Sequence, residues 1–336
     1  MTKKPQIILD VSPRRIEEVF STGDLQYLYQ IADVVWGKND PMPDEEFEKT
    51  KKDVLAIITG SWRYGDITAM PKLQAILEMR GGHPNPKVLD YRTCFERNIR
   101  VLSVSPAFGP MVAEMALGMA LAASRKIVDG SNDFQEGNER YQHSGNEGAF
   151  SLYGQTVGLI GCGNLAKNLM PLLLPFNCKF LGYDPWLSSR YLSRQGIHSV
   201  DIDSLLEKSK VIFVLAKPSA ENEAFLNRDR LALIKPNAVL VLISRSHVVD
   251  FDAMTDFLYE RRFKAAIDVF PKEPLPPDHP IRHAPGVVLS AHRAGTLRED
   301  MWELGRIAVN DLDAILQGLP PREMLPADPA IVFRHR

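Results

Sequence analysis

Short runs of Val, Ile and Leu alternate with longer amphipathic or polar stretches along the whole chain. This alternation is typical of βαβ units arranged around mostly parallel sheets. In the first hundred residues the predicted strands are 6–11, 33–37, 54–59, 73–77 and 100–104. A second series comprises 156–160, 179–183, 211–216, 238–243, 265–269 and 287–290. The strands of the second series are almost continuously apolar, which indicates a sheet covered on both faces.

A long helical pattern between the two series runs from Met111 to about Lys126. The segment before it, 105–110, contains two prolines and a glycine, and we place the crossing between two domains there. Residues 129–153 are rich in Gly, Asn, Ser and Glu and have little periodicity, so we expect an irregular surface segment.

The last long helix should begin at Thr296, because Thr296 and Glu299 match the S/T-x-x-E capping box. It should end at Gly318, before the prolines at 320 and 321. Because this helix follows the second sheet, we expect it to return to the first domain.

Composition and charge narrow the classes of function. The chain has 336 residues, with 40 basic and 42 acidic side chains, so nucleic acid and anionic membranes are disfavoured as partners. No apolar run approaches the roughly 20 residues that are needed to span a bilayer. The three cysteines form neither a disulfide framework nor a zinc pattern, so we expect a soluble protein of the reducing cytoplasm with no metal site.

The segment from Gly161 to Ala166 follows the predicted strand 156–160 and opens a helix. In this context Gly-x-Gly-x-x-Ala is a dinucleotide-binding fingerprint. Gly161 permits the tight turn, Gly163 lets a pyrophosphate approach the backbone, and the helix N-terminus favours phosphate charge. The alternative is a strand-to-helix turn that is glycine-rich by chance and binds no dinucleotide.

Asp184 ends the second strand of this series, about twenty residues after the fingerprint. A carboxylate there accepts hydrogen bonds from an adenosine ribose diol and repels a 2′-phosphate. The residues that follow, Pro185 and Trp186, supply no arginine for a phosphate. The sequence therefore predicts NAD over NADP.

Three charged side chains each follow a buried strand of the second series: Arg245, Glu273 and His292. The carboxyl ends of parallel strands meet at one sheet edge, where the dinucleotide also binds. Arg245 could hold a substrate carboxylate through paired hydrogen bonds. His292 could take the proton of a hydroxyl as hydride leaves, oriented by Glu273. Taken singly, Arg245 could equally be a solvated loop arginine, Glu273 a surface acid before a proline, and His292 a hydrogen-bonded turn histidine.

Together these residues resemble the D-2-hydroxyacid dehydrogenase family, on its phosphoglycerate-dehydrogenase-like side. The segments that carry the resemblance are 112–114, 157–163, 183–185, 233–238, 244–245 with 249–250, 268–270 with 273–274, and 292–295. The resemblance implies a catalytic set of Arg245, Glu273 and His292. It also implies dimers joined through the nucleotide domains and a cleft that closes on the substrate.

The resemblance also assigns binding residues. Cofactor contacts are implied for Gly161, Gly163, Asn164, Leu165, Asp184, Ser244, Arg245, Asp268, His292 and Gly295. Substrate contacts are implied for Arg245 and His292 and for the backbone N–H groups of Arg80, Gly81 and Gly82. The substrate loop departs from the family's pattern by continuing as His83-Pro84-Asn85-Pro86, and Arg293 adds a cation beside His292.

The predicted fold class is therefore α/β, with two Rossmann-like or flavodoxin-like domains that contain parallel sheets. Residues 1–107 and 300–336 should form a discontinuous substrate domain into which an NAD-binding domain, 108–299, is inserted. We expect NAD-dependent interconversion of a D-2-hydroxy acid and a 2-keto acid by a homodimer. The alternative is a catalytically weak NAD(H)-binding sensor or scaffold protein of the same fold.

Overall fold

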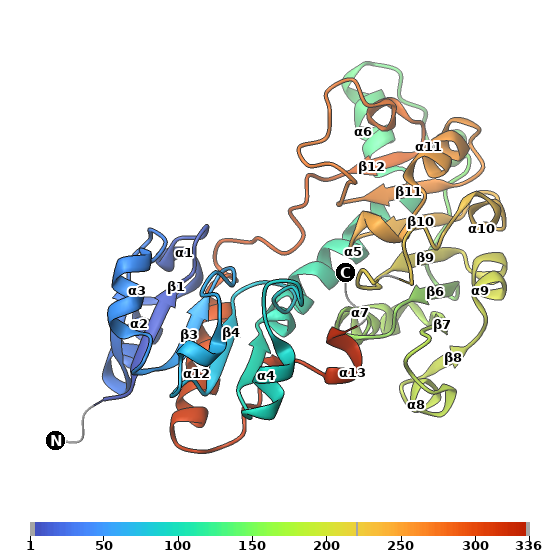
Figure 1. Ribbon diagram of the computed structural model, residues 1–336. Helices are drawn as coiled ribbons and strands as arrows, with labels where there is room; N and C mark the ends of the chain where they lie inside the picture. Colours follow the sequence, from blue (N-terminus) through green and yellow to red (C-terminus); the bar gives the residue numbers. More distant parts are fainter. Residues whose placement is uncertain (1–3, 220, 334–336) are drawn as a thin grey trace. The chain divides into compact units, whose positions relative to one another are not determined.

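The chain folds into two compact units in a computed structural model that describes residues 4–219 and 221–333. Unit 1 contains Met1–Phe108 and Thr296–Arg336, and unit 2 contains Gly109–Gly295. In Figure 1 the blue and red ends of the chain belong to unit 1, and the green to orange middle forms unit 2. Unit 2 is thus inserted into a discontinuous unit 1, and the chain passes between the units after Phe108 and after Gly295.

The sheet of unit 1 has the strand order β13-β5-β4-β3-β1-β2. Its strands are β1 Gln6–Asp10, β2 Asp33–Gly37, β3 Val54–Thr59, β4 Ala75–Glu78, β5 Arg100–Ser103 and β13 Leu325–Pro326. All pairs are parallel except the antiparallel β13–β5 pair. The carboxyl ends of β1, β3, β4 and β5 therefore lie at one edge.

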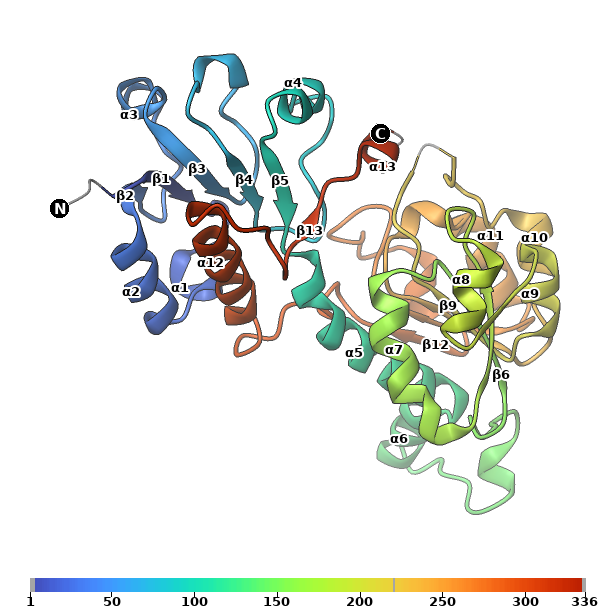
Figure 2. The same cartoon turned by 90° about the horizontal axis from the view of Figure 1, so that it is seen from below.

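Helices cover both faces of this sheet (Figure 2). They are α1 Ile16–Val19, α2 Thr22–Ile31, α3 Asp44–Thr50, α4 Tyr91–Glu96, α12 Trp302–Leu316 and α13 Pro329–Val332. One apolar cluster joins the strands to α1, α2 and α12, and the other joins them to α3 and α4. Side chains alternate between the faces, because Leu77 belongs to the first cluster and Ile76 to the second.

The sheet of unit 2 is entirely parallel, with the order β12-β11-β10-β9-β6-β7-β8. Its strands are β6 Thr156–Ile160, β7 Lys179–Tyr183, β8 Ile197–Ser199, β9 Val211–Val214, β10 Val239–Leu242, β11 Lys264–Ile267 and β12 Val287–Leu289. The order reverses between β6 and β9, which is the switch point where doubly wound sheets bind ligands.

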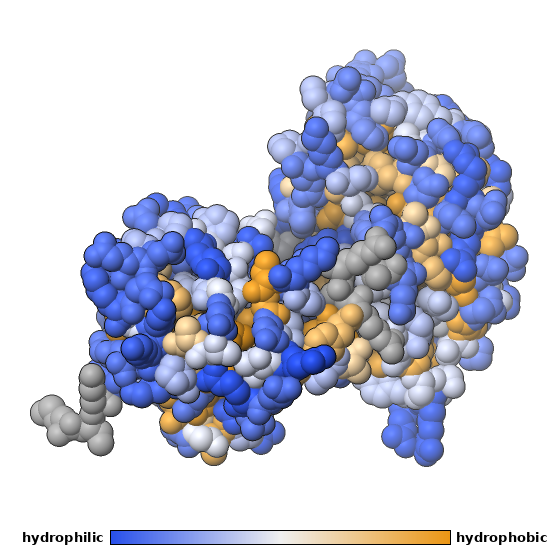
Figure 3. All heavy atoms as spheres, in the orientation of Figure 1, coloured by the Kyte–Doolittle hydropathy of each residue, from blue (hydrophilic) through white to orange (hydrophobic). Residues whose placement is uncertain are grey.

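The helices of unit 2 are α5 Gly109–Ser124, α6 Ile127–Gln135, α7 Asn164–Leu173, α8 Ser189–Arg194, α9 Ile202–Lys208, α10 Arg228–Ala232 and α11 Phe251–Tyr259. Helices α5 and α7 share an apolar cluster with one face of the sheet, and α9, α10 and α11 share another with the opposite face. Hydrophilic side chains cover most of the visible surface of both units in Figure 3. The covered sheet and the parallel strands confirm the predicted fold class.

One stretch, Ser105–Ser124, is long and apolar enough to cross a membrane, with a mean hydropathy of 1.4. The sequence expectation that no run approaches this length is therefore wrong. Half of the stretch is buried, and α5 contacts α7 and strands β10, β11 and β12. Its apolar character is explained by burial inside unit 2 of side chains such as Ala116 and Met119.

The last long helix is shorter than predicted, because α12 begins at Trp302 and not at Thr296. The amides of Asp300 and Met301 both bond to the carbonyl of Leu297, so this segment is a turn. Residues 296–300 are exposed, and burial begins at Met301. Helical stability comes mainly from packing, so the capping pattern alone does not start a helix there.

Two further elements differ from the sequence expectations. Residues 129–153, predicted to be irregular, begin inside α6, which covers Ile127–Gln135. The apolar side chains of α6 face solvent, so its pattern does not resemble that of a core helix. Strand β8, Ile197–Ser199, was not predicted, because three residues are too few to show a period.

Candidate active site

The loop between β6 and α7 has the geometry that a dinucleotide phosphate requires. Gly161 has φ +89°, and a Cβ there would lie 2.7 Å from the backbone of Ala216, so only glycine fits. A Cβ at Gly163 would meet no atom within 4 Å, which leaves open space above the backbone. Gly163 is also the N-cap of α7. The observed loop therefore fits a pyrophosphate at a helix N-terminus.

Asp184 follows β7 and links this strand to the glycine loop. Its Oδ2 accepts the backbone N–H of Cys162 at 2.9 Å, and its Oδ1 accepts that of Trp186 at 3.0 Å. Burial raises the pKa of the Cys162 thiol to about 12, and the charge of Asp184 contributes to this rise. Cys162 is thus an inert packing residue, and Asp184 holds the loop in place.

The other predicted residues of unit 2 gather at the carboxyl ends of β10, β11 and β12. Ser244 and Arg245 follow β10, Asp268 follows β11, and His292 follows β12. These strands are adjacent in the parallel sheet, with β9 and β6 next in order. All these residues therefore lie along the sheet edge that carries the glycine loop.

His292 and Glu273 form a direct pair. His292 Nδ1 lies 2.7 Å from Glu273 Oε2, and Glu273 Oε1 accepts the backbone N–H of Phe270 at 3.0 Å. Partial burial on its own raises the pKa of Glu273. The hydrogen bonds from His292 and Phe270 and the positive charge of Arg245 outweigh burial and hold this pKa below its usual value. Glu273 is thus kept ionised beside the imidazole.

Asp268 positions the segment that contains His292. Its carboxylate is fully buried and accepts the N–H of Arg293 at 3.0 Å and that of Ala294 at 3.2 Å. Its backbone carbonyl accepts the N–H of His292 at 2.7 Å. His292 has φ +52°, a left-handed conformation that is uncommon outside glycine. Asp268 therefore stabilises a backbone geometry that His292 would rarely adopt unaided.

Arg245 is anchored next to this pair. Its Nη1 donates to the carbonyl of Ser244 at 2.7 Å, and the Ser244 hydroxyl lies 2.9 Å from the carbonyls of Val214 and Ala216. Arg245 also lowers the pKa of Lys217, after the larger effect of burial, although part of the Lys217 side chain stays exposed. Sequence reasoning missed Lys217, whose only signal is its place just after β9.

The predicted substrate loop belongs to unit 1. Arg80, Gly81 and Gly82 follow β4, and the carbonyl of Arg80 accepts the Ser103 hydroxyl at 2.9 Å. The polar continuation of the loop is also held: the His83 imidazole lies 2.9 Å from the carbonyl of Leu325, and Tyr91 donates to the carbonyl of Pro84 at 2.6 Å. The longer loop is therefore an ordered part of unit 1.

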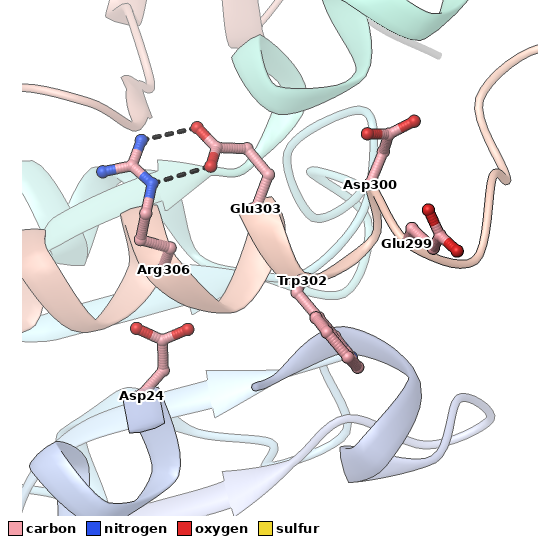
Figure 4. A pocket seen from close by; sticks show the side chains of 6 residues that line it. All are labelled: Asp24, Glu299, Asp300, Trp302, Glu303 and Arg306. Atoms are coloured by element: carbon pink, nitrogen blue, oxygen red, sulfur yellow. Dashed lines mark hydrogen bonds and ion pairs between the residues drawn. The ribbon is translucent and has the colours of Figure 1, made fainter. Parts of the chain in front are cut away.

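A surface hollow of about 230 Å³ in unit 1 is a poor alternative site. Figure 4 shows its lining, which consists of Asp24, Glu299, Asp300, Trp302, Glu303 and Arg306. Four carboxylates surround one cation, and that cation pairs with Glu303. Such a hollow repels an anionic ligand. Among the described residues, no group of three or more His, Cys, Asp or Glu side chains could hold a metal ion.

Comparisons with known proteins agree with this geometry. Residues 117–294 match the family described as D-isomer specific 2-hydroxyacid dehydrogenase, NAD binding domain. A glyoxylate reductase of Thermofilum pendens is 30% identical over 91% of this chain and 92% of its own length. A D-3-phosphoglycerate dehydrogenase of Methanocaldococcus jannaschii is 29% identical over 82% of this chain, which spans only 52% of that relative.

A solved structure shows the same architecture. A phosphoglycerate oxidoreductase from Rhizobium etli superposes with a TM-score of 0.84 at 32% identity, over 97% of this chain and 99% of that one. The chain belongs to the D-isomer specific 2-hydroxyacid dehydrogenase family. It is an oxidoreductase that uses a nicotinamide dinucleotide to interconvert a D-2-hydroxy acid and a 2-keto acid. The predicted family, activity and cofactor class are thereby confirmed over the sensor or scaffold alternative.

Proposed function

We propose that His292, Glu273 and Arg245 carry the dehydrogenase reaction. The observation that carries this proposal is the 2.7 Å contact between His292 and Glu273 at the sheet edge that also holds the glycine loop. With Nδ1 facing Glu273, Nε2 of His292 can take the proton of a substrate hydroxyl or return it to a keto oxygen. Glu273 fixes the tautomer and stabilises the charge that the ring gains. The bound nicotinamide supplies the hydride acceptor or donor.

Arg245 holds the substrate carboxylate. A guanidinium binds a carboxylate through two parallel charged hydrogen bonds, which also fix its orientation. The resemblance to the family extends this proposal to the backbone N–H groups of Arg80, Gly81 and Gly82 as substrate contacts. Fixing the carboxylate orients the carbon that exchanges hydride, and this alone contributes a large part of the rate.

The cofactor is NAD in this proposal. Gly161, Gly163, Asn164 and Leu165 hold the phosphates, and Asp184 accepts the ribose hydroxyls. Each oxygen of Asp184 has two lone pairs, so its bonds to Cys162 and Trp186 leave acceptor capacity. The remaining cofactor contacts come from Ser244, Arg245, Asp268, His292 and Gly295. A 2′-phosphate beside the Asp184 carboxylate would be repelled.

We infer the range of substrates from the names of similar proteins. A protein named glyoxylate reductase aligns over nearly its whole length, and a solved relative is named a phosphoglycerate oxidoreductase. We therefore place the substrate among small 2-keto acids, phosphorylated or not. A panel of glyoxylate, hydroxypyruvate, pyruvate, phosphohydroxypyruvate and aryl keto acids, followed by NADH consumption, identifies it.

His292→Ala tests the central assignment. Loss of a general base lowers kcat by about 10² to 10⁴-fold, whereas NADH binding, followed by Trp fluorescence, should stay close to wild type. Equal turnover in variant and wild type would refute the role of His292. An inactive wild type across the whole panel would refute the proposed function itself.

The assembly proposed is a homodimer in the cytoplasm, joined through unit 2. Helix α6 and the segment after it expose Ile127, Val128, Phe134 and Tyr141, with Phe134 63% exposed. Exposed apolar side chains concentrated in one segment typically mark a protein interface. Phe134→Glu should convert the dimer to a monomer in light scattering after size exclusion, whereas Glu136→Gln on the same segment should not.

A further inference from the structure

A second group of charges lies at the carboxyl edge of the unit 1 sheet. Arg14 follows β1 and Arg80 follows β4, and both strands run parallel in that sheet. Arg14 Nη1 donates to the carbonyl of Met79 at 2.7 Å, so its guanidinium reaches the turn between Glu78 and Arg80. Arg80 Nε lies 4.0 Å from Glu78 Oε1. Two cations thus meet around one carboxyl group.

Glu78 is an unusual residue for this position. It ends β4, only 3% of it is exposed, and its Oε2 has no hydrogen-bond partner among the residues the structure describes. Burial raises the pKa of Glu78 to about 7, even though Arg80 and Arg14 act in the opposite direction. The carboxyl group is therefore a weak counter-charge for two guanidinium groups near neutral pH.

The two arginines retain binding capacity. A guanidinium has five N–H donors, and one donor of Arg14 is bonded in the part of the chain that is described. Arg14 also lies 5.5 Å from the centre of the Phe108 ring, and its pKa is lowered first by burial and then by the charge of Arg80. The exposed Glu18 on α1 is the other nearby carboxylate, and it already accepts the N–H of Arg15 at 2.9 Å.

We propose that Arg14 and Arg80 form an oxyanion-binding site in unit 1, which takes a phosphate or carboxylate group. Two guanidinium groups held together at a buried turn repel one another, and an oxyanion between them removes that repulsion through charged hydrogen bonds. The occupant is either a free anion or a second acidic group of the substrate. The second case refines the proposed function, on which it rests, by making the substrate a dianionic 2-keto acid.

Binding is tested first without turnover. The melting temperature of the full chain is measured in inorganic phosphate and in chloride at equal ionic strength, because a ligand that binds only the folded state stabilises it. Phosphate should raise the melting temperature of the wild type and of Arg92→Gln, a matched change at an exposed position of α4. Arg14→Gln and Arg80→Gln should lose most of this shift. Glu78→Gln should enlarge it, because a competing carboxylate is removed.

Turnover then separates the two occupants. Two matched pairs are compared: phosphohydroxypyruvate with hydroxypyruvate, and 2-oxoglutarate with 2-oxopentanoate. If the site takes a substrate group, Arg14→Gln should lower the ratio of kcat/KM for the dianion to that for the monoanion by about tenfold or more. An unchanged ratio together with a lost phosphate shift assigns the site to a free anion.

Each failure has a distinct signature. A phosphate shift that is the same in wild type, Arg14→Gln and Arg80→Gln overturns the oxyanion site, whatever the enzyme reduces. Absence of reduction for every keto acid overturns the proposed function and leaves the thermal measurement as the test of the site. Arg80 is 54% exposed in its side chain, so Arg80→Gln remains informative if Arg14→Gln does not fold.

Discussion

Glu273 Oε2 lies 2.7 Å from His292 Nδ1, while its Oε1 accepts the N–H of Phe270 at 3.0 Å. Both oxygens are therefore used to fix one carboxylate beside one imidazole. Glu273→Gln keeps the shape but removes the charge, so kcat should fall by about 10- to 100-fold while NADH affinity stays close to wild type. Steady-state kinetics combined with NADH titration checks this, and a variant with wild-type kcat would argue against the pair.

Asp268 offers a separate test of how His292 is positioned. Asn at this position can accept at only one of the two N–H groups that now bond to the carboxylate, and its own NH₂ faces the other. We expect Asp268→Asn to lower the free energy of unfolding by about 2 kcal/mol and to reduce kcat. Urea denaturation and kinetics measure both effects. Asp252→Asn, on an exposed helix position of the same unit, should change neither.

Asp184 should determine the choice of cofactor. Asp184→Ser removes the charge that repels a 2′-phosphate, so the ratio of kcat/KM with NADPH to that with NADH should rise by roughly 10- to 100-fold. Because Asp184 also bonds to the N–H groups of Cys162 and Trp186, KM should rise for both cofactors. Kinetics with each cofactor at fixed keto acid gives the ratio, and a ratio that does not move would contradict the assignment.

Glu78 predicts how stability depends on pH. The pKa of Glu78 is about 7 in the folded protein and 4.5 without burial. As the pH rises, its carboxyl group therefore ionises at a lower pH in the unfolded chain than in the folded one. The folded state is therefore penalised progressively between these two values, by up to about 3 kcal/mol above pH 7. Glu78→Gln should remove this penalty. It should be more stable than the wild type at pH 8, and this advantage should shrink towards pH 4.5.

Urea titrations across that pH range measure the difference. Glu96→Gln, at the end of α4, is the matched control and should show no such pH-dependent gain. A Glu78→Gln variant whose relative stability is the same at pH 5 and pH 8 would show that the carboxyl group is not the cause.

Much of the fold could be predicted, because buried parallel strands are nearly continuous apolar runs. The strands and the helices that cover them are predicted by this pattern together with the Gly and Pro residues that separate elements. The elements that were missed lack such a signal: β8 has three residues, and α6 presents its apolar side chains to solvent. The start of α12 was misplaced because a capping pattern says nothing about where packing begins.

The candidate site could be predicted in part for a related reason. Arg245, Asp268 and His292 are polar residues that end apolar strands, and topology brings such positions to one edge. The contact between Glu273 and His292 depends on the conformation of the loop between β11 and β12. The sequence pattern does not predict that conformation. The burial of Glu78 was not predicted either. A glutamate directly after the apolar run Ala75-Ile76-Leu77 could have indicated it.

The insertion of unit 2 has a consequence for how the protein is made. Helix α12 supplies Leu304, Ile307 and Leu312 to the same apolar cluster as β1 and β4. On the ribosome, residues 1–108 therefore remain without this helix until α12 has emerged. All the strands of unit 2 have been synthesised well before that point. Synthesis thus reaches unit 1 before unit 2 but completes unit 2 first.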